Sequence, residues 1–315
     1  MAGDQANTLF TRAGPTRAAY LLGKYLPRPL GYLVARLIAL WLVTRKPATY
    51  YGALENLPHV LPPGSTERDV LRAARSVFLN SARYYYDLFH NLARGGVEVS
   101  QYRPRVRLKP GVAETIAEAV ASGRGLLLLG SHLSNFDLAG IVLTHHTPVP
   151  PQALSLADPA PGFEFINALR ASKGRGVITP ISPRSLREAV ERLRGGGIVM
   201  TGVDRPLETG NDPVTFFGET AYLPTGYMRI PLLVDCLFLT VSFLYESGPQ
   251  GGGYWIMANP PMEVERTGNR QDDVTVNVQR VLRQIEDFIR LAPDQWMVFK
   301  PVWRRSEGDQ VHATQ

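Results

Sequence analysis

The stretch GLLLLGSHLSNFDLAG, residues 125–140, decides the fold class. Its first part, Gly125–Gly130, is a continuous apolar run of strand length, which is typical of a strand buried on both faces of a parallel sheet. A helical pattern follows from Ser134 to His146. The stretch therefore predicts a buried strand, a turn that carries His132, and then a helix.

The same alternation continues on both sides of this stretch. Strand patterns occur at 105–109, 176–181, 198–204, 232–245 and 254–260. Helical patterns occur at 111–123, 186–197 and 276–296. This order predicts an α/β fold with a mostly parallel or mixed sheet flanked by helices.

One segment outside this alternation and one residue within it receive an interpretation of their own. The segment VTFFGETAYLPTG, residues 214–226, is apolar and interrupted by Gly and Pro without a strand pattern. It predicts a rigid loop that either lines an apolar channel or packs in the core. Cys236 lies inside the apolar run 232–245 and is interpreted as a small core residue of a strand.

The N-terminal part of the chain is predicted to be helical. Residues 30–43, LGYLVARLIALWLV, form an apolar run with Arg36 at its middle and Lys24 and Arg45 beyond its ends. As a helix this run covers ~21 Å, which is short of the ~30 Å hydrocarbon core of a membrane. The pattern favours a helix lying in a membrane interface, and an ordinary buried helix is the alternative. A second helix is predicted over residues 66–94.

The composition narrows the class of partner. The 315 residues carry a net charge of +6, and the 34 basic residues comprise 29 Arg and 5 Lys. Arg binds phosphate and carboxylate in a bidentate manner, so the excess indicates a surface for anionic lipid or phosphate, although codon bias explains it equally well. Nucleic acid is not expected, since no zinc-finger, basic-heptad or RNA-binding signature occurs. A single Cys excludes an intrachain disulfide.

Two strand ends carry candidate catalytic residues, because sites in parallel sheets lie at the carboxyl ends of strands. His132 follows the first strand and is a candidate general base, kept neutral by the positive end of the next helix. With Ser134 as N-cap, Asp137 would be at N3 and could hold the imidazole, but a simple capping box explains the same spacing. Asp204 and Arg205 follow the second strand, where a structural ion pair is the alternative.

Several other chemistries lack support in the sequence. It contains no G-x-S-x-G elbow, P-loop or G-x-G-x-x-G motif. The adjacent residues His145 and His146 would point in different directions on a helix and have no acidic partner at metal-ligand spacing. Neither a metal nor a bound cofactor is therefore expected.

The H-x4-D spacing of His132 and Asp137 after an apolar strand resembles the signature of the glycerolipid and glycolipid acyltransferases. The surrounding GSHLSNFDLAG is similar to the G-H-F-G-N-W-E block of the bacterial lipid A late acyltransferases and the actinobacterial phosphatidylinositol mannoside acyltransferases. Further segments that resemble blocks of this family follow in the same order, at 54–61, 170–178, 203–226 and 293–303. The resemblance covers roughly residues 17–305.

This resemblance implies a glycerolipid acyltransferase-like fold and an acyltransferase activity. The acyl donor would be acyl-CoA or acyl carrier protein, acting as cosubstrate, and the acceptor a hydroxyl of a membrane glycolipid. We expect a helical membrane-associating region over 1–96, a catalytic core over 97–305 and a polar tail over 306–315. We also expect peripheral binding to the anionic cytoplasmic face of the plasma (inner) membrane.

The resemblance also implies roles for individual residues. His132 would take the proton of the acceptor hydroxyl, and either Asp137 or Asp204 would orient its imidazole. Arg170 or Arg205 would stabilise the oxyanion or hold phosphate. The remaining candidates for substrate binding, with the FFG segment forming an acyl channel, are Asn135, Phe216, Phe217 and Gly218.

Three alternatives stay open at this point. A lysophosphatidate-type acyltransferase also carries H-x4-D, but its F-P-E-G-T-R block is missing here. A non-catalytic lipid-binding or lipid-transfer protein could use the same apolar channel. A hydrolase would use water as the acceptor.

Overall fold

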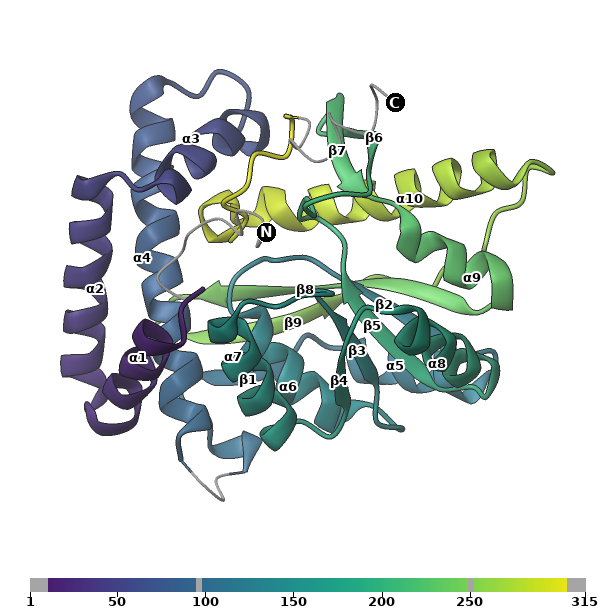
Figure 1. The fold of residues 1–315 in the computed structure, drawn as a ribbon, viewed down its shortest axis with the longest axis horizontal. Coiled ribbons are helices and arrows are strands. Elements are labelled where there is room, and N and C mark those ends of the chain that lie inside the picture. The colour runs from purple at the N-terminus through teal and green to yellow at the C-terminus, as the bar shows by residue number, and fades with distance from the viewer. Residues whose placement is uncertain (1–10, 95–97, 249–251, 305–315) are drawn as a thin grey trace.

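A seven-stranded sheet with the strand order β1-β9-β8-β2-β5-β3-β4 lies at the centre of the computed structural model, which describes residues 11–94, 98–248 and 252–304. Five of its strands, β8, β2, β5, β3 and β4, run parallel, whereas β9 runs antiparallel to β8 and pairs in parallel with β1. Helices cover both faces of the sheet (Figure 1). The predicted α/β fold with a mixed, mostly parallel sheet is confirmed.

The elements have the following bounds. The strands of the large sheet are β1 Arg105–Leu108, β2 Leu126–Gly130, β3 Gln152–Ser155, β4 Val177–Pro180, β5 Ile198–Gly202, β8 Leu237–Glu246 and β9 Gly253–Ala258. The α-helices are α1 Ala13–Tyr25, α2 Arg28–Arg45, α3 Ala48–Val60, α4 Glu67–Leu92, α5 Val112–Ala121, α6 Phe136–His146, α7 Pro161–Lys173, α8 Pro183–Arg194, α9 Arg229–Val234 and α10 Arg270–Leu291. A separate hairpin consists of β6 Asn211–Phe216 and β7 Glu219–Pro224, and short 3-10 turns are η1 Val99–Gln101, η2 Gly226–Met228 and η3 Pro293–Gln295.

Strand β2 explains why the apolar run at 126–129 decides the fold. Its four leucines are completely buried, and alternate side chains enter two different hydrophobic cores. Leu127 and Leu129 pack in the core that contains the buried face of α10, while Leu126 and Leu128 pack in the core that contains α5 and α6. Figure 1 shows α10 and α5 on opposite sides of the sheet. A strand between two layers of helices has no solvent-facing side, so its sequence lacks polar positions.

The helices α1 and α2 pack closely against α4. A Cβ atom at Gly31 of α2 would lie 1.9 Å from the Tyr86 ring, and one at Gly23 of α1 would lie 2.7 Å from the Phe89 side chain. Glycine at these two positions therefore permits the close approach of the helices. The predicted helix at 30–43 is present within α2, and the one at 66–94 is present as α4. Among the described residues, no helix is both long and apolar enough to cross a membrane.

A buried polar cluster joins α2 and α4 to β9. The carboxylate of Asp87, which is fully buried, accepts hydrogen bonds from Tyr32 Oη at 2.8 Å and Tyr254 Oη at 2.6 Å. Arg28 in turn donates to Tyr32 Oη at 2.8 Å. Burial raises the pKa of Asp87 to about 6, although these hydrogen bonds and the charges of Arg83 and Arg28 oppose the rise.

The segment 214–226 is a β-hairpin, so the prediction of a rigid loop is wrong. Strands β6 and β7 pair antiparallel from Asn211↔Pro224 to Phe216↔Glu219. Phe217 and Gly218 form the two-residue turn, with φ angles of 52° and 79°. Both angles are positive, as the tight turns that match the twist of a hairpin require. The Gly and Pro residues that suggested a loop therefore mark the turn and the end of a strand.

The predicted strand at 232–245 is also partly wrong. Residues 232–234 are the last turn of α9, and β8 begins at Leu237. Asp235 between them has a φ of 55°, which ends the helix. Cys236 is fully buried as expected, but it lies in this connection and not in the strand. The proposed tail at 306–315 and the residues 95–97 at the expected domain boundary lie outside the described residues.

Candidate active site

The carboxyl ends of β2 and β5 bring two sequence-distant side chains together. The two strands are neighbours in parallel register, with Gly130 opposite Gly202. His132 and Asp204 each follow two residues later, so both reach the same edge of the sheet. A Cβ atom at Gly202 would lie 2.6 Å from Cε1 of His132, and the imidazole therefore occupies the space left by this glycine.

Asp204 holds His132 through both its main chain and its ring. His132 Nδ1 lies 2.6 Å from Asp204 Oδ1, and the His132 backbone amide donates to both carboxylate oxygens at 3.1 and 2.9 Å. Trp296 Nε1 donates to Oδ2 at 2.8 Å. A carboxylate at Nδ1 assigns the ring proton to that nitrogen and leaves Nε2 as an acceptor. His132 lines the large cavity described below.

Asp204 is fully buried, yet its environment favours the ionised form. Burial alone would raise the pKa of Asp204, but the charge and hydrogen bonds of His132 and the hydrogen bond from Trp296 outweigh it and lower that pKa. Asp204 therefore remains a carboxylate and stabilises any positive charge that develops on the imidazole. Trp296 was predicted as part of a family block without a role, and the structure gives it this one.

Asp137 does not contact the imidazole. Its carboxylate accepts a hydrogen bond from Tyr84 Oη and lies 3.1 Å from Arg170 Nε in a largely buried ion pair. The expectation that Ser134 caps the helix is wrong, because α6 begins at Phe136 with Asn135 as its N-cap. Asp137 is therefore at N2, and no Ser134–Asp137 capping box forms.

The Asn135 side chain forms structural hydrogen bonds with both of its polar atoms. Its Oδ1 accepts from the Leu138 amide at 3.1 Å, and its Nδ2 donates to the Tyr84 carbonyl at 3.0 Å. The side chain is fully buried and is not among the residues that line the cavity. This placement joins α6 to α4 and does not support the expected contact with substrate.

The two candidate arginines differ in their partners. Both Arg170 and Arg205 line the cavity. Arg170 is paired with Asp137, whereas no carboxylate in the described part of the chain forms an ion pair with Arg205. Burial lowers the pKa of Arg205, and the nearby charge of Asp204 opposes this effect. A guanidinium in such a position can bind a phosphate or carboxylate of a ligand.

The cavity beside His132 has a volume of about 1720 Å³. Its lining comes from α1, α2 and α4 on one side, from α7, α8 and α9 on another, and from the carboxyl ends of β2, β3 and β5. Apolar side chains dominate on both sides, with Ile38 and Leu42 of α2 and Leu186 and Ile230 of α8 and α9 as examples. The size and lining are suited to a long acyl chain.

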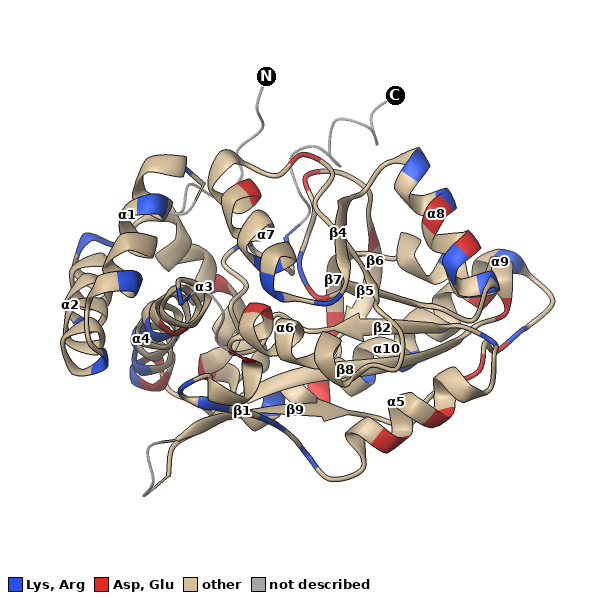
Figure 2. Cartoon of the chain, turned by 90° about the horizontal axis from the view of Figure 1, so that it is seen from below, with Lys and Arg blue, Asp and Glu red and all other residues tan. Residues whose placement is uncertain are grey.

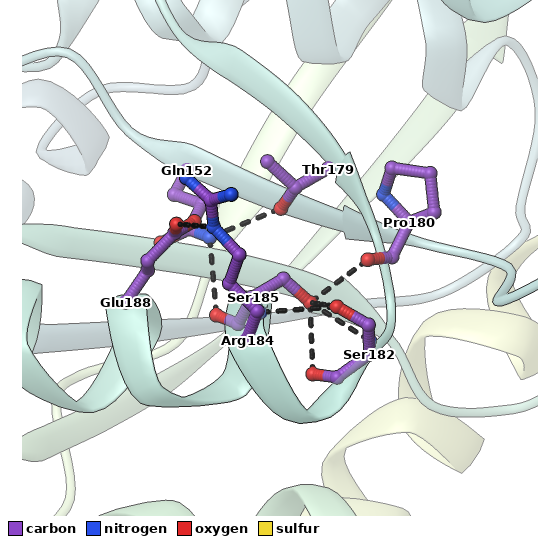
Figure 3. Close-up of polar contacts among 7 residues, drawn as sticks. All are labelled: Gln152, Thr179, Pro180, Ser182, Arg184, Ser185 and Glu188. Atoms are coloured by element: carbon purple, nitrogen blue, oxygen red, sulfur yellow. Dashed lines mark hydrogen bonds and ion pairs between the residues drawn. The ribbon is translucent and has the colours of Figure 1, made fainter.

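The cavity wall formed by β3, β4 and α8 is held by side-chain hydrogen bonds (Figure 3). Ser182 and Ser185 form a capping box at the start of α8, and Ser185 Oγ donates to the Pro180 carbonyl at 2.8 Å. Gln152 Nε2 donates to Thr179 Oγ1 at 3.0 Å and so connects β3 with β4. These hydrogen bonds join the three elements of the wall.

The FFG segment does not line the cavity. Phe216 is fully buried and stacks on Trp303 with ring centroids 5.7 Å apart. Phe217 and Gly218 are the hairpin turn, and the Phe217 amide donates to Glu286 Oε1 at 2.8 Å. None of the three is among the cavity-lining residues, so the structure does not support the expectation that this segment forms an acyl channel.

In the part of the chain that the structure describes, no group of three or more His, Cys, Asp or Glu side chains could hold a metal ion. His145 contacts the Lys173 carbonyl at 2.8 Å through Nε2.

Curated relatives of this chain are phosphatidylinositol mannoside acyltransferases. The chain is 23% identical over 263 residues to a phosphatidylinositol mannoside acyltransferase of Mycolicibacterium smegmatis, covering 82% of this chain and 81% of the relative. A protein of the same name from Mycobacterium tuberculosis is 24% identical over 254 residues, covering 79% and 75% of the two chains. A structure search finds the 1-acyl-sn-glycerophosphate acyltransferase PlsC of Thermotoga maritima with a TM-score of 0.36 and 14% identity, covering 84% of this chain and 99% of that chain.

The family comparison covers almost the whole described chain. The family described as bacterial lipid A biosynthesis acyltransferase matches residues 17–305. That range includes the buried strand β2, the His132–Asp204 pair and the Trp296 that contacts it. The resemblance predicted from the sequence is thereby confirmed, and the chain belongs to the bacterial lipid A biosynthesis acyltransferase family.

Proposed function

We propose that this acyltransferase moves an acyl chain from a soluble acyl thioester to a hydroxyl group of a sugar-bearing membrane lipid. The observation that carries the proposal is the His132–Asp204 hydrogen bond at the wall of a large, mainly apolar cavity. The family and the names of the relatives favour a glycolipid acceptor. Acyl-CoA and acyl carrier protein are both candidate donors.

The residues support a general-base mechanism. His132 Nε2 takes the proton of the acceptor hydroxyl while the hydroxyl oxygen attacks the carbonyl carbon of the thioester. Asp204 stabilises the imidazolium that forms. When the tetrahedral intermediate collapses, the C–S bond breaks, and the imidazolium returns its proton to the leaving thiolate. The products are the ester and the free thiol.

Arg205 is the better candidate for binding an anionic group of the substrates. Arg170 already neutralises Asp137, whereas Arg205 forms no ion pair among the described residues and lines the cavity. Thioester donors and anionic lipids both carry phosphate, which a guanidinium binds in a bidentate manner. We assign phosphate binding or oxyanion stabilisation to Arg205 and the positioning of Asp137 to Arg170.

The helices α1 and α2 support peripheral docking on an anionic membrane surface. Residues 11–54 contain seven Lys or Arg residues and no Asp or Glu, and blue positions without red ones mark α1 and α2 in Figure 2. One stripe of α2 exposes four apolar side chains, each more than half exposed: Leu30, Leu33, Leu37 and Trp41. Such a helix is suited to lie in the interface of an anionic leaflet. Trp41 also lines the cavity, so a lipid could enter from this side.

The proposal is tested by incubating the purified protein with radiolabelled acyl-CoA or acyl carrier protein and a glycolipid extract. We expect a labelled lipid ester, identified by mass spectrometry. The variant His132→Ala should lose at least about 100-fold in rate while its circular dichroism spectrum is unchanged. Labelled fatty acid without a lipid ester would indicate a hydrolase, and bound but unreacted acyl chain would indicate a lipid-binding protein. Either result contradicts the proposal, as does a fully active His132→Ala variant.

A further inference from the structure

Tyr227 carries a buried hydroxyl group without a hydrogen-bond partner. The residue is 9% exposed, and its Oη has no partner among the described residues. Tyr227 nevertheless lines the cavity that contains His132. A buried hydroxyl normally finds a partner, because its desolvation is otherwise uncompensated. An unpartnered hydroxyl at a cavity wall therefore points to a partner that arrives with the ligand.

Several other buried tyrosines of this protein have hydrogen-bond partners. Tyr84 donates to Asp137, and Tyr254 donates to Asp87 at 2.6 Å. Among the tyrosines that the structure describes, Tyr227 is the one whose fully buried Oη has no hydrogen-bond partner. Ser155 Oγ on β3 is a second unpartnered hydroxyl of a cavity-lining residue, but only Tyr227 shares the hydrophobic core with Trp296, which donates to Asp204. Tyr227 and His132 therefore line the same cavity.

The surroundings of Tyr227 hold its ring in place. It lies in the turn η2 directly after β7, where the Thr225 hydroxyl donates to the carboxylate of Asp212 on β6. The Met228 amide donates to the Thr225 carbonyl at 3.0 Å. The ring itself belongs to the hydrophobic core that also contains Trp296. A ring fixed in this way presents its hydroxyl without a large cost in side-chain entropy.

The Tyr227 hydroxyl keeps its proton and can donate it in a hydrogen bond. Burial, and to a smaller extent the charge of Asp204, raises the pKa of Tyr227 far above its ordinary value. The phenol therefore stays protonated over the range in which His132 works as a base. The phenol can donate a hydrogen bond to a carbonyl or hydroxyl oxygen of a ligand, but it does not exchange a proton with the substrate.

We propose that Tyr227 Oη donates a hydrogen bond to an oxygen atom of the substrate bound in the cavity that His132 also lines. The inference rests on the proposed acyl transfer and adds a substrate-binding residue to it. The oxygen belongs either to the thioester carbonyl, where negative charge develops, or to the acceptor lipid.

The test is the variant Tyr227→Phe, which keeps the ring and removes the hydroxyl. Because no protein group is left unpaired by the change, we expect the melting temperature to stay equal or to rise. Tyr50→Phe is the matched control, since Tyr50 is buried in the same hydrophobic core but does not line the cavity. A melting temperature that falls further in Tyr227→Phe than in Tyr50→Phe means that the hydroxyl has a structural partner, and it overturns the proposal.

Kinetics distinguish the two possible oxygens. If the partner is the thioester carbonyl, kcat should fall by about 10²–10³ both for transfer and for slow hydrolysis of the donor without acceptor. If the partner is the acceptor, KM for the lipid should rise by about 3- to 10-fold while hydrolysis is unchanged. In both cases the pH profile keeps its shape. If the wild type transfers acyl chains and Tyr227→Phe matches Tyr50→Phe in every parameter, this inference fails while the proposed function stands.

Discussion

Asp204 binds His132 at two points, the backbone amide and Nδ1 of the ring. The amide contact fixes the carboxylate relative to the strand end, and the ring contact then fixes the imidazole relative to the carboxylate. The orientation of Nε2 thus depends on the sheet and not on the rotamer of a surface side chain. Asp137, the acidic member of the H-x4-D spacing, contacts Tyr84 and Arg170 instead.

This arrangement ranks the two carboxylates. Asp204→Asn should lower kcat by about 10²–10⁴, because an amide neither selects the productive tautomer nor stabilises the imidazolium. Asp137→Asn should cost at least about tenfold less, since it weakens the pairing with Arg170 without touching the imidazole. Steady-state kinetics of both variants, with circular dichroism as the control for folding, check the order. Equal losses, or a larger loss in Asp137→Asn, would show that the assignment is incorrect.

Substitutions of the two arginines should have different effects on activity and stability. Arg205→Gln is expected to raise KM for the anionic substrate or lower kcat by about 10-fold or more. Its effect on stability should be small, because Arg205 forms no ion pair with any described residue. Arg170→Gln leaves the buried Asp137 without its cation and should lower the free energy of unfolding by about 3 kcal/mol. Urea unfolding and steady-state kinetics measure the two effects. A reversed pattern would exchange the roles of the two residues.

Asp87 should make stability fall as pH rises from about 4 to about 6. Its pKa is about 6 in the folded protein and 3.8 ordinarily, so the unfolded chain releases this proton first as pH increases. Stability is lost over that interval and is constant above it, and the difference corresponds to about 3 kcal/mol. Asp87→Asn removes this dependence, so the stability of the variant relative to wild type should improve between pH 4 and pH 7. Urea unfolding at both pH values measures it, and parallel pH curves for the two proteins would refute the assignment.

The exposed stripe of α2 should determine membrane binding. Leu37, which is 57% exposed, makes few contacts that a substitution could disturb. Leu37→Glu places a negative charge within the basic, apolar face and should reduce sedimentation with anionic vesicles by at least about 10-fold, with the melting temperature unchanged. Leu291→Glu is the control, because Leu291 is 60% exposed on a different helix. If both variants bind vesicles equally well, α2 is not the docking surface.

The sequence predicted those parts of the fold that depend on a local pattern. The four leucines of β2 identify a strand buried on both faces, and the helical spacing in 278–289 identifies α10. The hairpin at 211–224 and the break at Asp235 were missed, because one or two residues with positive φ determine each and the surrounding apolar residues carry no periodic signal. Local patterns thus locate elements more reliably than the turns between them.

The candidate site was predicted in part for the same reason. His132 and Asp204 stand at strand ends, which the sequence can locate. The choice between Asp204 and Asp137 depends on α4 and α7, which supply Tyr84 and Arg170 from distant parts of the chain. No sequence pattern predicts the unpartnered hydroxyl of Tyr227 either, because the lack of a partner depends on how distant parts of the chain fold around it.

In the proposed mechanism, the pairing of β2 with β5 makes strand alignment a determinant of activity. Gly130 and Gly202 face each other, so His132 and Asp204 are equivalent positions on the two strands. A one-residue insertion within β5 would displace Asp204 along the sheet by about 3.3 Å or turn it toward the opposite face. Either change would separate the carboxylate from the imidazole while every site residue kept its identity. An insertion in β5 can therefore abolish activity without altering any side chain of the site.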